Sequence, residues 1–563
     1  CLMYDRHYKI DKIDVEKFAA WYVADAETRA RDFTGYSIPE IIQNWPAHGP
    51  ETDEYDFYLA PFYDFNGDGF YDPGFCDYPY YDLDKSKPCN TVPERRAENL
   101  DNSTATLFGD QTLWWVYNDK GNIHTATTGA APIGMEFRAQ AFAFSTNDEL
   151  NDMTFYNYQI INRSTYTLAD TYFGVWTDAD MGLAWDDYIG CDVNKGLGYL
   201  YNGDNQDGDG NGITYGSQPP AIGIDFFEGP YQDPDGQDNS SSWYDANGNK
   251  LLTPLCDTNI TNGNINGLNF GDGVIDNERW GMRRFLYFNN DGSNTGNPET
   301  ALDIYNYLKG MWRDGRKMVY GGDGYSGTGP EADFMFPNDT DPCGWGTGGL
   351  PQDPWTEEGE GNTPFDRRFV QSAGPFVLEP GAVNDITIGA VWARAGSGGA
   401  YASVNEVRRA DNKAQKLFEN CFQVLDGPDA PEMDIVELDR RFIFHLWNRT
   451  NSNNYLESYL EEDPFIECPT DMPDCDKYYK FQGYQVYQLS DPGVSISDIY
   501  DLDLARLVFQ CDIEDDVTKI VNFVWSDELE ANIPVLEVNG NNQGISHTFE
   551  IDYDAFAAGD RRL

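Results

Sequence analysis

The stretch from Tyr172 to Gly212 crowds together more carboxylates than a folded chain holds without a positive partner. It opens as an expected strand, places aspartates in one short loop system, and returns as a second apolar run that ends among glycines. Carboxylates this close repel one another, and few Lys or Arg residues lie nearby in sequence. A divalent cation that prefers oxygen ligands, calcium before zinc, is the partner these residue types favour. The residues concerned are Asp178, Asp180, Asp186, Asp187, Asp192, Asp204, Asp207 and Asp209.

An earlier segment repeats the first half of a calcium-loop spacing. Asp64, Asn66 and Asp68 take the first, third and fifth places of such a loop. Gly69 takes the sixth place and Asp72 the ninth, whereas the glutamate expected at the twelfth place is missing. We predict a calcium site here, with a metal-free Asx/Gly turn as the alternative.

Acidic loops of the same kind recur further along the chain. Asn205, Asp207 and Asp209 repeat the first half of the loop spacing, and Asp272 and Asp276 form a looser group. None of these segments has the complete twelve-residue pattern. We therefore expect calcium to bind where strand ends and folded-back loops bring several acids together, and we expect its role to be structural.

The charge balance limits the partners of the chain. Acidic residues number 95 against 38 basic ones, which gives a formal net charge of -57. This excess repels itself in a compact fold and argues against nucleic acid as a partner, because phosphate binding needs clustered Lys and Arg. Hydrophobic residues make up 40% of the chain, enough to build cores. No apolar run is long enough to span a membrane as a helix.

The cysteine pattern indicates an oxidising compartment. Ten cysteines are scattered through the 563 residues, with no spacing typical of a zinc site. We predict disulfides, with free buried thiols as the alternative, and expect local pairs between Cys76 and Cys89 and between Cys468 and Cys475.

The hydrophobic pattern predicts a mainly β protein in three parts. Residues 1–110 read as helical and loop-rich, with one helix over 14–31. For residues 111–425 the pattern predicts a β-sandwich. This part has a long Asp/Gly/Asn-rich loop insertion at about 202–375. It ends in a helix that begins at a capping box, Ser403 to Glu406. A Pro- and Gly-containing linker follows, and residues 432–563 read as a second sandwich that stops without a final strand. We expect the chain to be a segment of a longer precursor.

The sequence carries no recognisable catalytic motif. It has no G-x-S-x-G nucleophile elbow, no H-E-x-x-H, no phosphate-binding loop and no dinucleotide fingerprint. The five histidines are isolated from one another in sequence. Paired carboxylates for glycoside hydrolysis remain open as an alternative, because acids are abundant throughout.

Several runs resemble a known group of proteins. They include FGDQTLWWVYNDKGNIH, PIGMEFRAQAFAF, MTFYNYQIINRS, YFGVWTDADMG and RRFVQSAGPFVLEPGAVNDITIGAVWAR, and they are similar to large secreted surface proteins of Bacteroidetes-type bacteria. Such proteins are exported by the type IX secretion system. The later run FQGYQVYQL resembles a strand of fibronectin type III-like domains. The resemblance implies an extracellular or outer-surface location.

Together these observations lead to two expectations about function. The first is a non-catalytic, calcium-stabilised secreted or cell-surface protein with a structural or adhesive role. Its partners would be other cell-surface or extracellular proteins, including further copies of itself. The second is a glycan-active module, either a glycoside hydrolase or a carbohydrate-binding protein, suggested by the 15% aromatic content.

Overall fold

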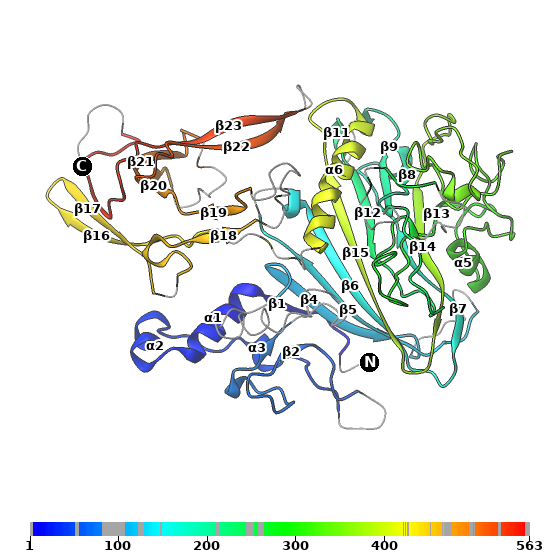
Figure 1. Cartoon of the computed structure of the whole chain (residues 1–563), viewed down its shortest axis with the longest axis horizontal. Helices are drawn as coiled ribbons and strands as arrows, with labels where there is room; N and C mark the ends of the chain where they lie inside the picture. The colour runs from blue at the N-terminus through cyan, green and yellow to red at the C-terminus, as the bar shows by residue number, and fades with distance from the viewer. Residues whose placement is uncertain are drawn as a thin grey trace. The chain divides into compact units, whose positions relative to one another are not determined.

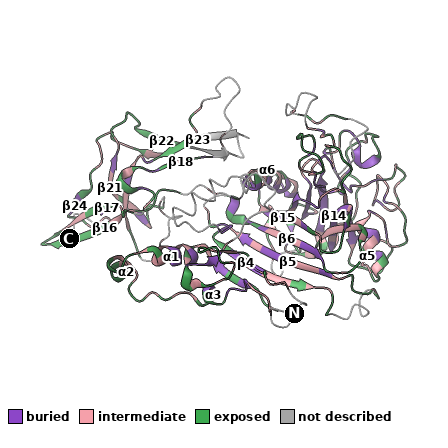
Figure 2. Ribbon diagram, turned by 60° about the horizontal axis from the view of Figure 1, so that its bottom comes forward, coloured by how far each residue is buried: buried purple, intermediate pink, exposed green. Residues whose placement is uncertain are grey.

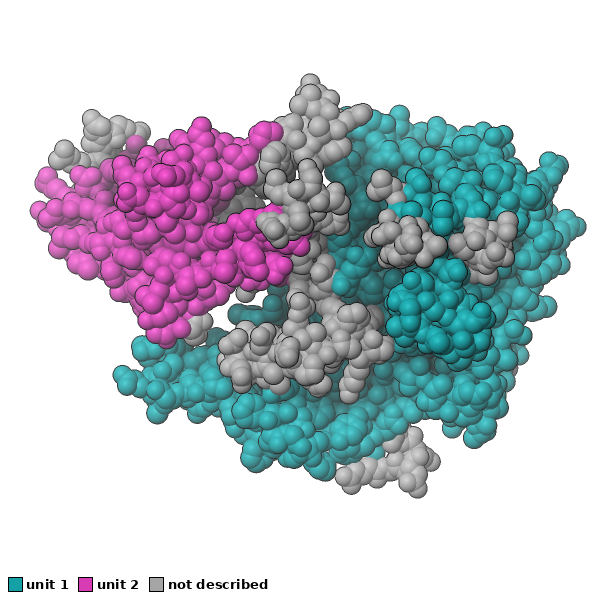
Figure 3. Space-filling view, viewed as in Figure 1, with its two compact units in different colours: residues 1–422 teal, residues 423–563 magenta. Residues whose placement is uncertain are grey.

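The computed structural model consists of two compact units, Cys1–Phe422 and Gln423–Leu563 (Figure 3). The structure describes residues 4–50, 56–80, 107–121, 129–146, 149–208, 214–243, 251, 253–256, 264–419, 422, 424, 427–450, 452–463, 466, 475–491, 494, 499, 501–526 and 531–557. Both units are built mainly from β-strands, which confirms the predicted class of fold. Among the described residues, no helix is both long and apolar enough to cross a membrane.

The first unit begins with a short strand and three helices. Strand β1 (Tyr8–Asp11) is followed by α1 (Lys12–Val23), α2 (Ala26–Asp32) and α3 (Glu40–Gln43). The single helix predicted over 14–31 is therefore wrong. The helix is interrupted because Asp25 caps α2, its side chain accepting a hydrogen bond from the Thr28 N–H at 2.8 Å.

An antiparallel sheet of eight strands forms the centre of this unit (Figure 1). Its order is β1-β4-β5-β6-β15-β12-β9-β8, so strands far apart in sequence become neighbours. The strands are rich in aromatic and β-branched residues, which suit a sheet covered by other elements. Their bounds are β4 (Gln111–Asn118), β5 (Met135–Ala143), β6 (Met153–Asn162), β8 (Asp187–Asp192), β9 (Leu197–Asn202), β12 (Ala221–Glu228) and β15 (Val383–Ala393).

Strand β12 shows how the two faces of this sheet are covered. Successive side chains of a strand point to opposite faces. A Cβ on Gly223 would lie 2.6 Å from Val407 of helix α6 (Ala400–Glu419), so that face carries the helix. Ile222 and Ile224 instead pack into the large buried cluster that contains Phe285 and Phe369. The buried residues coloured in Figure 2 include parts of both the sheet strands and α6.

Those phenylalanines belong to a second, three-stranded sheet in the order β13-β14-β7. Its strands are β7 (Leu168–Thr177), β13 (Arg284–Asn289) and β14 (Arg367–Leu378). Helix α5 (Ala301–Leu308) is started by a capping box between Thr300 and Asp303. Leu308 of this helix lies against Gly174 of β7, where a Cβ would be 2.2 Å from its side chain.

The predicted loop insertion at 202–375 contains more regular structure than expected. Strands β12 and β13, helix α5 and the start of β14 all fall within it, together with the short pair β10 (Gln206–Asp207) and β11 (Gly216–Ser217). The remaining loops are anchored by buried side chains, including the fully buried Trp312 and Trp355. Another short pair, β2 (Phe62–Tyr63) and β3 (Tyr78–Pro79), closes the loop that carries Asp64.

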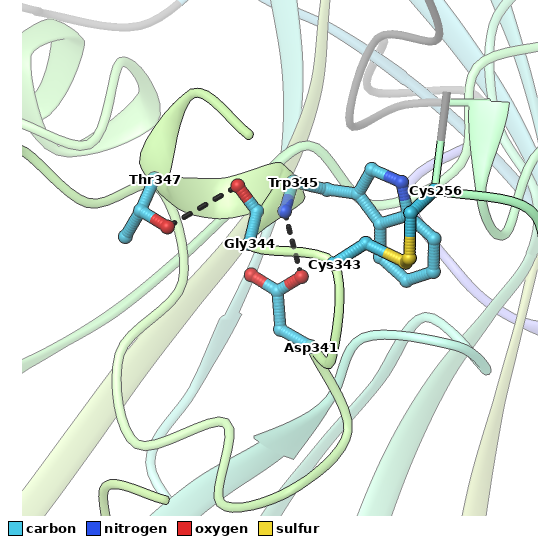
Figure 4. Close-up of a disulfide and its surroundings, with 6 residues drawn as sticks. All are labelled: Cys256, Asp341, Cys343, Gly344, Trp345 and Thr347. Atoms are coloured by element: carbon cyan, nitrogen blue, oxygen red, sulfur yellow. Dashed lines mark hydrogen bonds between the residues drawn. A yellow bond between two sulfur atoms is a disulfide. The ribbon is translucent and has the colours of Figure 1, made fainter. Parts of the chain in front are cut away.

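One disulfide also joins these loops. Cys256 and Cys343 are bonded across 87 residues of sequence, and Figure 4 shows the bridge beside the ring of Trp345. Asp341 accepts a hydrogen bond from the Trp345 N–H at 2.7 Å, which fixes the turn after Cys343. A disulfide is consistent with an extracellular protein.

The predicted local cysteine pairs have different outcomes. Cys76 is a buried free thiol, which contradicts the pairing with Cys89, and Cys89 lies outside the described residues. The burial of Cys76 raises the pKa of its thiol to about 11. Cys475 is disulfide-bonded, and its predicted partner Cys468 lies outside the described residues.

The second unit is a set of small antiparallel sheets. Rings from two of them meet in its core, where Phe509 stacks on Phe549 with centroids 3.9 Å apart and planes 4° apart. The strands are β16 (Glu432–Leu438), β17 (Arg441–Trp447), β18 (Leu460–Glu462), β19 (Tyr478–Lys480), β20 (Gly483–Leu489), β21 (Ala505–Asp512), β22 (Lys519–Ser526), β23 (Ala531–Asn539) and β24 (Thr548–Ile551). Strands β16, β17 and β24 form one sheet, and the others pair two by two.

Candidate metal centre

Two neighbouring strands of the three-stranded sheet bring three aspartates together. Strands β7 and β14 are antiparallel, with Thr177 opposite Phe369. Continuing that register beyond the paired residues places Arg368 opposite Asp178 and Asp366 opposite Asp180. Alternate residues of a strand share a face, so all four of these side chains emerge on the same side. We call Asp178, Asp180 and Asp366 the aspartate triad.

The triad has the geometry of an oxygen-ligand site. One carboxylate oxygen from each aspartate can be chosen so that all three lie within 4.8 Å of one another. Asp178 and Asp180 are exposed, whereas Asp366 is buried, with 6% of its surface accessible. The three carboxylates share one face of the sheet, and one side of the group is open to water. A cation bound there could keep some water ligands.

The charges around the triad are only partly neutralised by protein groups. Arg368 binds Asp178 through Nε at 2.9 Å, and its Nη2 lies 3.7 Å from Asp366 Oδ1. Asp366 Oδ2 accepts a hydrogen bond from Asn290 at 2.7 Å. Burial raises the pKa of Asp180, and the negative charges of Asp178 and Asp366 raise it further, while Arg368 opposes them.

One oxygen of the triad lacks the hydrogen bond that buried polar atoms normally have. Asp366 Oδ1 is buried and accepts no hydrogen bond from the described residues. Leaving such an atom unbonded is costly. Three carboxylates and one guanidinium leave a net charge of about -2, which a divalent cation would balance. The triad could therefore hold a metal ion, and its all-oxygen donor set suits calcium.

A second acidic group lies in the adjoining loop and strand. Asp187 opens β8 directly opposite Asn202 of β9, and both side chains are fully buried. Asp207 is fully buried too, and its two oxygens accept hydrogen bonds from the N–H groups of Leu183, at 2.8 Å, and Tyr215. Asp186 accepts a hydrogen bond from the Gly208 N–H at 3.0 Å.

Burial dominates the electrostatics of this group. It raises the pKa of Asp187 to about 9, with the nearby Met181 N–H opposing the rise and the charges of Asp186, Asp207 and Asp180 adding to it. Burial also raises the pKa of Asp186. Asp180 thus acts electrostatically on both the triad and this second group.

Asp192 does not belong to either group. It ends β8, five residues after Asp187, which puts the two about 17 Å apart along the strand. Its buried carboxylate binds Arg408 of α6 with an Nε to Oδ2 distance of 2.6 Å. The five aspartates from Asp178 to Asp192 therefore separate, because the strand carries Asp192 to the opposite end of the sheet.

The Asp64 loop is closed by its own hydrogen bonds. Asp64 accepts from the N–H groups of Gly67 and Gly69, each at 2.7 Å, through different oxygens. Asn66 and Asp68 bond to each other, and Asp72 accepts from the Gly74 N–H at 2.7 Å. These are the contacts of Asx turns, as the metal-free alternative expects, and the calcium site in this loop stays a prediction.

The remaining predicted residues are distributed among loop contacts. Asp276 accepts from the N–H groups of Asp235 and Gly236, while Asp238 accepts from those of Gly271 and Gly273, so two acidic segments interlock. The Asp272 carboxylate accepts a hydrogen bond from the Val274 N–H within its own turn. Asn205 accepts from the Ala400 N–H at the start of α6. Asp209 lies outside the described residues.

Sequence reasoning missed Asp366. Its local sequence, Phe365-Asp366-Arg367-Arg368, contains no loop motif. The useful signal is the alternation of charges on both strands, with Asp178 and Asp180 after β7 and Asp366 and Arg368 at the start of β14. That signal requires knowing that the two strands pair.

Comparison with models of known protein families and with curated proteins finds no match to this chain.

Proposed function

We propose that this chain is a non-catalytic, calcium-stabilised protein of the outer cell surface or extracellular space, with a structural or adhesive role. The observation that carries the proposal is the aspartate triad, in which a buried carboxylate oxygen of Asp366 has no hydrogen-bond donor among the described residues. The acidic excess and the Cys256–Cys343 disulfide support an extracellular setting, where calcium is plentiful.

The export route and the finer fold belong to the same proposal. The runs that resemble type IX-secreted proteins support that route. The contact of two sheets around Ile222, Phe285 and Phe369 supports a sandwich-like first unit. The stacking of Phe509 on Phe549 between two small sheets supports a fibronectin type III-like second unit.

Thermal unfolding with calcium and with a chelator tests the calcium proposal. A ligand of the native state at about one hundred times its Kd adds about 2.7 kcal/mol to the free energy of unfolding. We expect calcium to raise the melting temperature of the wild-type protein and to have a smaller effect on Asp366→Asn. The exposed Asp152, outside the acidic loops, provides a control variant, Asp152→Asn, that should respond as the wild type does.

Two results would contradict the proposal. One is a wild-type melting temperature that is the same with calcium and with chelator. The other is an Asp366→Asn variant that folds and gains as much stability from calcium as Asp152→Asn does. Far-UV circular dichroism before heating shows whether each variant has folded.

A cavity in the second unit favours glycan binding as a second candidate function. It has a volume of about 920 Å³ and is lined by tyrosines and amides, among them Tyr478, Tyr479, Gln482 and Gln510. Tyr478 and Tyr479 are about half exposed, at 47% and 51%. Aromatic rings with nearby hydrogen-bonding groups suit the flat faces and hydroxyls of sugars.

Glycan-array binding separates this candidate from the first. Under the glycan proposal the full chain should bind a defined set of glycans, and replacing Tyr478 and Tyr479 by alanine should weaken binding at least tenfold. The exposed Tyr166 of the first unit supplies the control substitution. Absence of binding by the folded wild-type chain, or unchanged binding by the double variant, would contradict this candidate.

A further inference from the structure

Asp187 differs from several other buried acids of the first unit, which are paired with cations. Asp192 is paired with Arg408, Glu357 with Arg367, and Asp411 with Lys195. Asp187 has no surface exposure, and neither of its carboxylate oxygens makes a hydrogen bond of ordinary geometry with a described residue, although the nearby Met181 N–H lowers its pKa. The charged groups that act on it most strongly are other carboxylates, those of Asp186, Asp207 and Asp180. A fully buried acid in this setting needs a partner of some kind.

From this arrangement we propose a second calcium site, separate from the aspartate triad, ligated by Asp187, Asn202 and Asp186. It goes beyond the proposed function, because it assigns an ion to the interior of the large sheet and does not depend on the triad being occupied.

Unbonded oxygens of neighbouring residues support this assignment. Asp187 and Asn202 are directly opposite in antiparallel strands, and side chains in such pairs share a face with Cβ atoms about 5 Å apart. The amide oxygen of Asn202 is buried without a hydrogen-bond donor among the described residues, and so is Oδ1 of Asp186. With both oxygens of Asp187, this makes four buried oxygens without donors, supplied by the first residue of β8, the residue before it and the last residue of β9.

The amide nitrogen of Asn202 already donates a hydrogen bond to another group. Its Nδ2 donates to the Asp204 carbonyl at 3.0 Å, which leaves the oxygen as the end without a partner. Asp186 likewise uses Oδ2 to accept from Gly208 and leaves Oδ1 unbonded. Each residue thus has one atom bonded to the protein and one oxygen free to bind a metal.

A proton alone would not satisfy this group. One proton on Asp187 could bond two of the four oxygens to each other, and the other two would remain unbonded. A cation bound at Asp187 would take several of these oxygens as ligands and would also offset the charges of Asp186 and Asp207. Carboxylate and amide oxygens are ligands of calcium, which takes six to eight oxygens, so water or carbonyl groups would complete its shell.

The loop that encloses the group is shaped by a glycine. Gly182 has a φ of +85°, and a Cβ there would lie 1.9 Å from Asp207 Oδ2. Because position 182 has no side chain, Asp207 can be buried against the turn that precedes Asp186 and Asp187. The turn therefore holds a third carboxylate beside the proposed ligands.

Counting bound calcium by native mass spectrometry of the full chain tests the proposal. We expect Asp187→Asn to bind one calcium ion fewer than the wild type and Asp366→Asn to lose a different ion, so that the double variant loses two. Asp152→Asn should match the wild type. A folded Asp187→Asn variant that keeps the wild-type number of ions would overturn the second site.

This experiment separates the two sites. Loss of an ion in Asp187→Asn but not in Asp366→Asn would support the second site and contradict the triad as a calcium site. The reverse pattern would overturn the second site and leave the triad standing.

A second variant keeps the proposal testable if Asp187→Asn fails to fold. Asn202→Asp replaces an amide oxygen ligand by a carboxylate and adds one buried negative charge. With calcium bound there, the substitution should tighten calcium binding about tenfold and increase the difference in melting temperature between calcium and chelator. If that difference is unchanged and Asn202→Asp merely melts earlier in both conditions, no ion binds at this position and the proposal is overturned.

Discussion

The buried carboxyl groups of Asp225 in strand β12 and Asp411 in helix α6 lie close enough to act on each other electrostatically. Two buried carboxyl groups in this arrangement repel each other unless one of them holds a proton. Asp411 also binds Lys195 at 3.0 Å, which favours its ionised form, so the proton resides on Asp225. Both side chains are buried, and burial raises the pKa of Asp225 well above its ordinary value, with the charge of Asp411 adding to the rise.

This pair predicts a pH dependence of stability. In the unfolded chain Asp225 ionises near pH 4, whereas in the folded protein it keeps its proton at higher pH. The folded state thus binds one more proton, and this group lowers the free energy of unfolding as the pH rises above about 4. Asp225→Asn cannot titrate, so its stability relative to the wild type should increase with pH by up to about 1.4 kcal/mol per unit.

Urea unfolding at several pH values measures this difference. The exposed Asp152 supplies the control substitution, Asp152→Asn. A constant difference between Asp225→Asn and the wild type from pH 4 to pH 7 would show that Asp225 is ionised in the folded protein.

Adjacent arginines of α6 allow a matched test of the Asp192 contact. Arg408 binds the buried Asp192, whereas Arg409 pairs with Glu406 along the surface of the helix. Arg408→Ala should cost about 3 kcal/mol of stability because it leaves a buried carboxylate without a partner. Arg409→Ala should cost less than about 1 kcal/mol. Chemical denaturation of the two variants gives the comparison, and equal losses would contradict a special role for the buried contact.

The close packing of α6 on β12 predicts the effect of adding one methyl group. A Cβ at position 223 would lie 2.6 Å from Val407 and 2.8 Å from Leu197, so Gly223→Ala should cost about 1–3 kcal/mol. A Cβ at Gly292 would have no atom of the described residues within 4 Å, and Gly292→Ala should change stability by no more than about 0.5 kcal/mol. Thermal unfolding of both variants is the measurement. Tolerance of alanine at 223 would mean that the helix does not pack against this strand.

The Cys256–Cys343 disulfide closes a long loop and should contribute strongly to stability. By the chain-entropy argument, a bridge across 87 residues raises the free energy of unfolding by about 4.6 kcal/mol. The variant with both cysteines replaced by alanine should unfold at a correspondingly lower urea concentration. An unchanged midpoint would show that the loops around Trp345 are held by burial alone.

Regular elements could be predicted where a single segment of the sequence contained the complete pattern of a strand or a helix. The alternation around Ile386 and Ile388 lies within β15, and the capping box at Ser403 lies within α6, which begins three residues earlier. Strand β12 was missed because its eight residues lie among glycine- and proline-rich turns. Asp178 and Asp180 were found because they are close in sequence, whereas Asp366 required the register of β7 against β14.

That register also has a consequence for the order of folding. Asp366 meets Asp178 and Asp180 only after β14 has aligned with β7, and a long stretch of the first unit separates these strands in sequence. Closing so long a loop is slow, and a chain that has not yet done so presents only part of the triad's ligands. Calcium bound at the triad would therefore stabilise the product of a late folding step. A chain that folds where calcium is scarce would stay easier to unfold than the same chain after calcium is supplied.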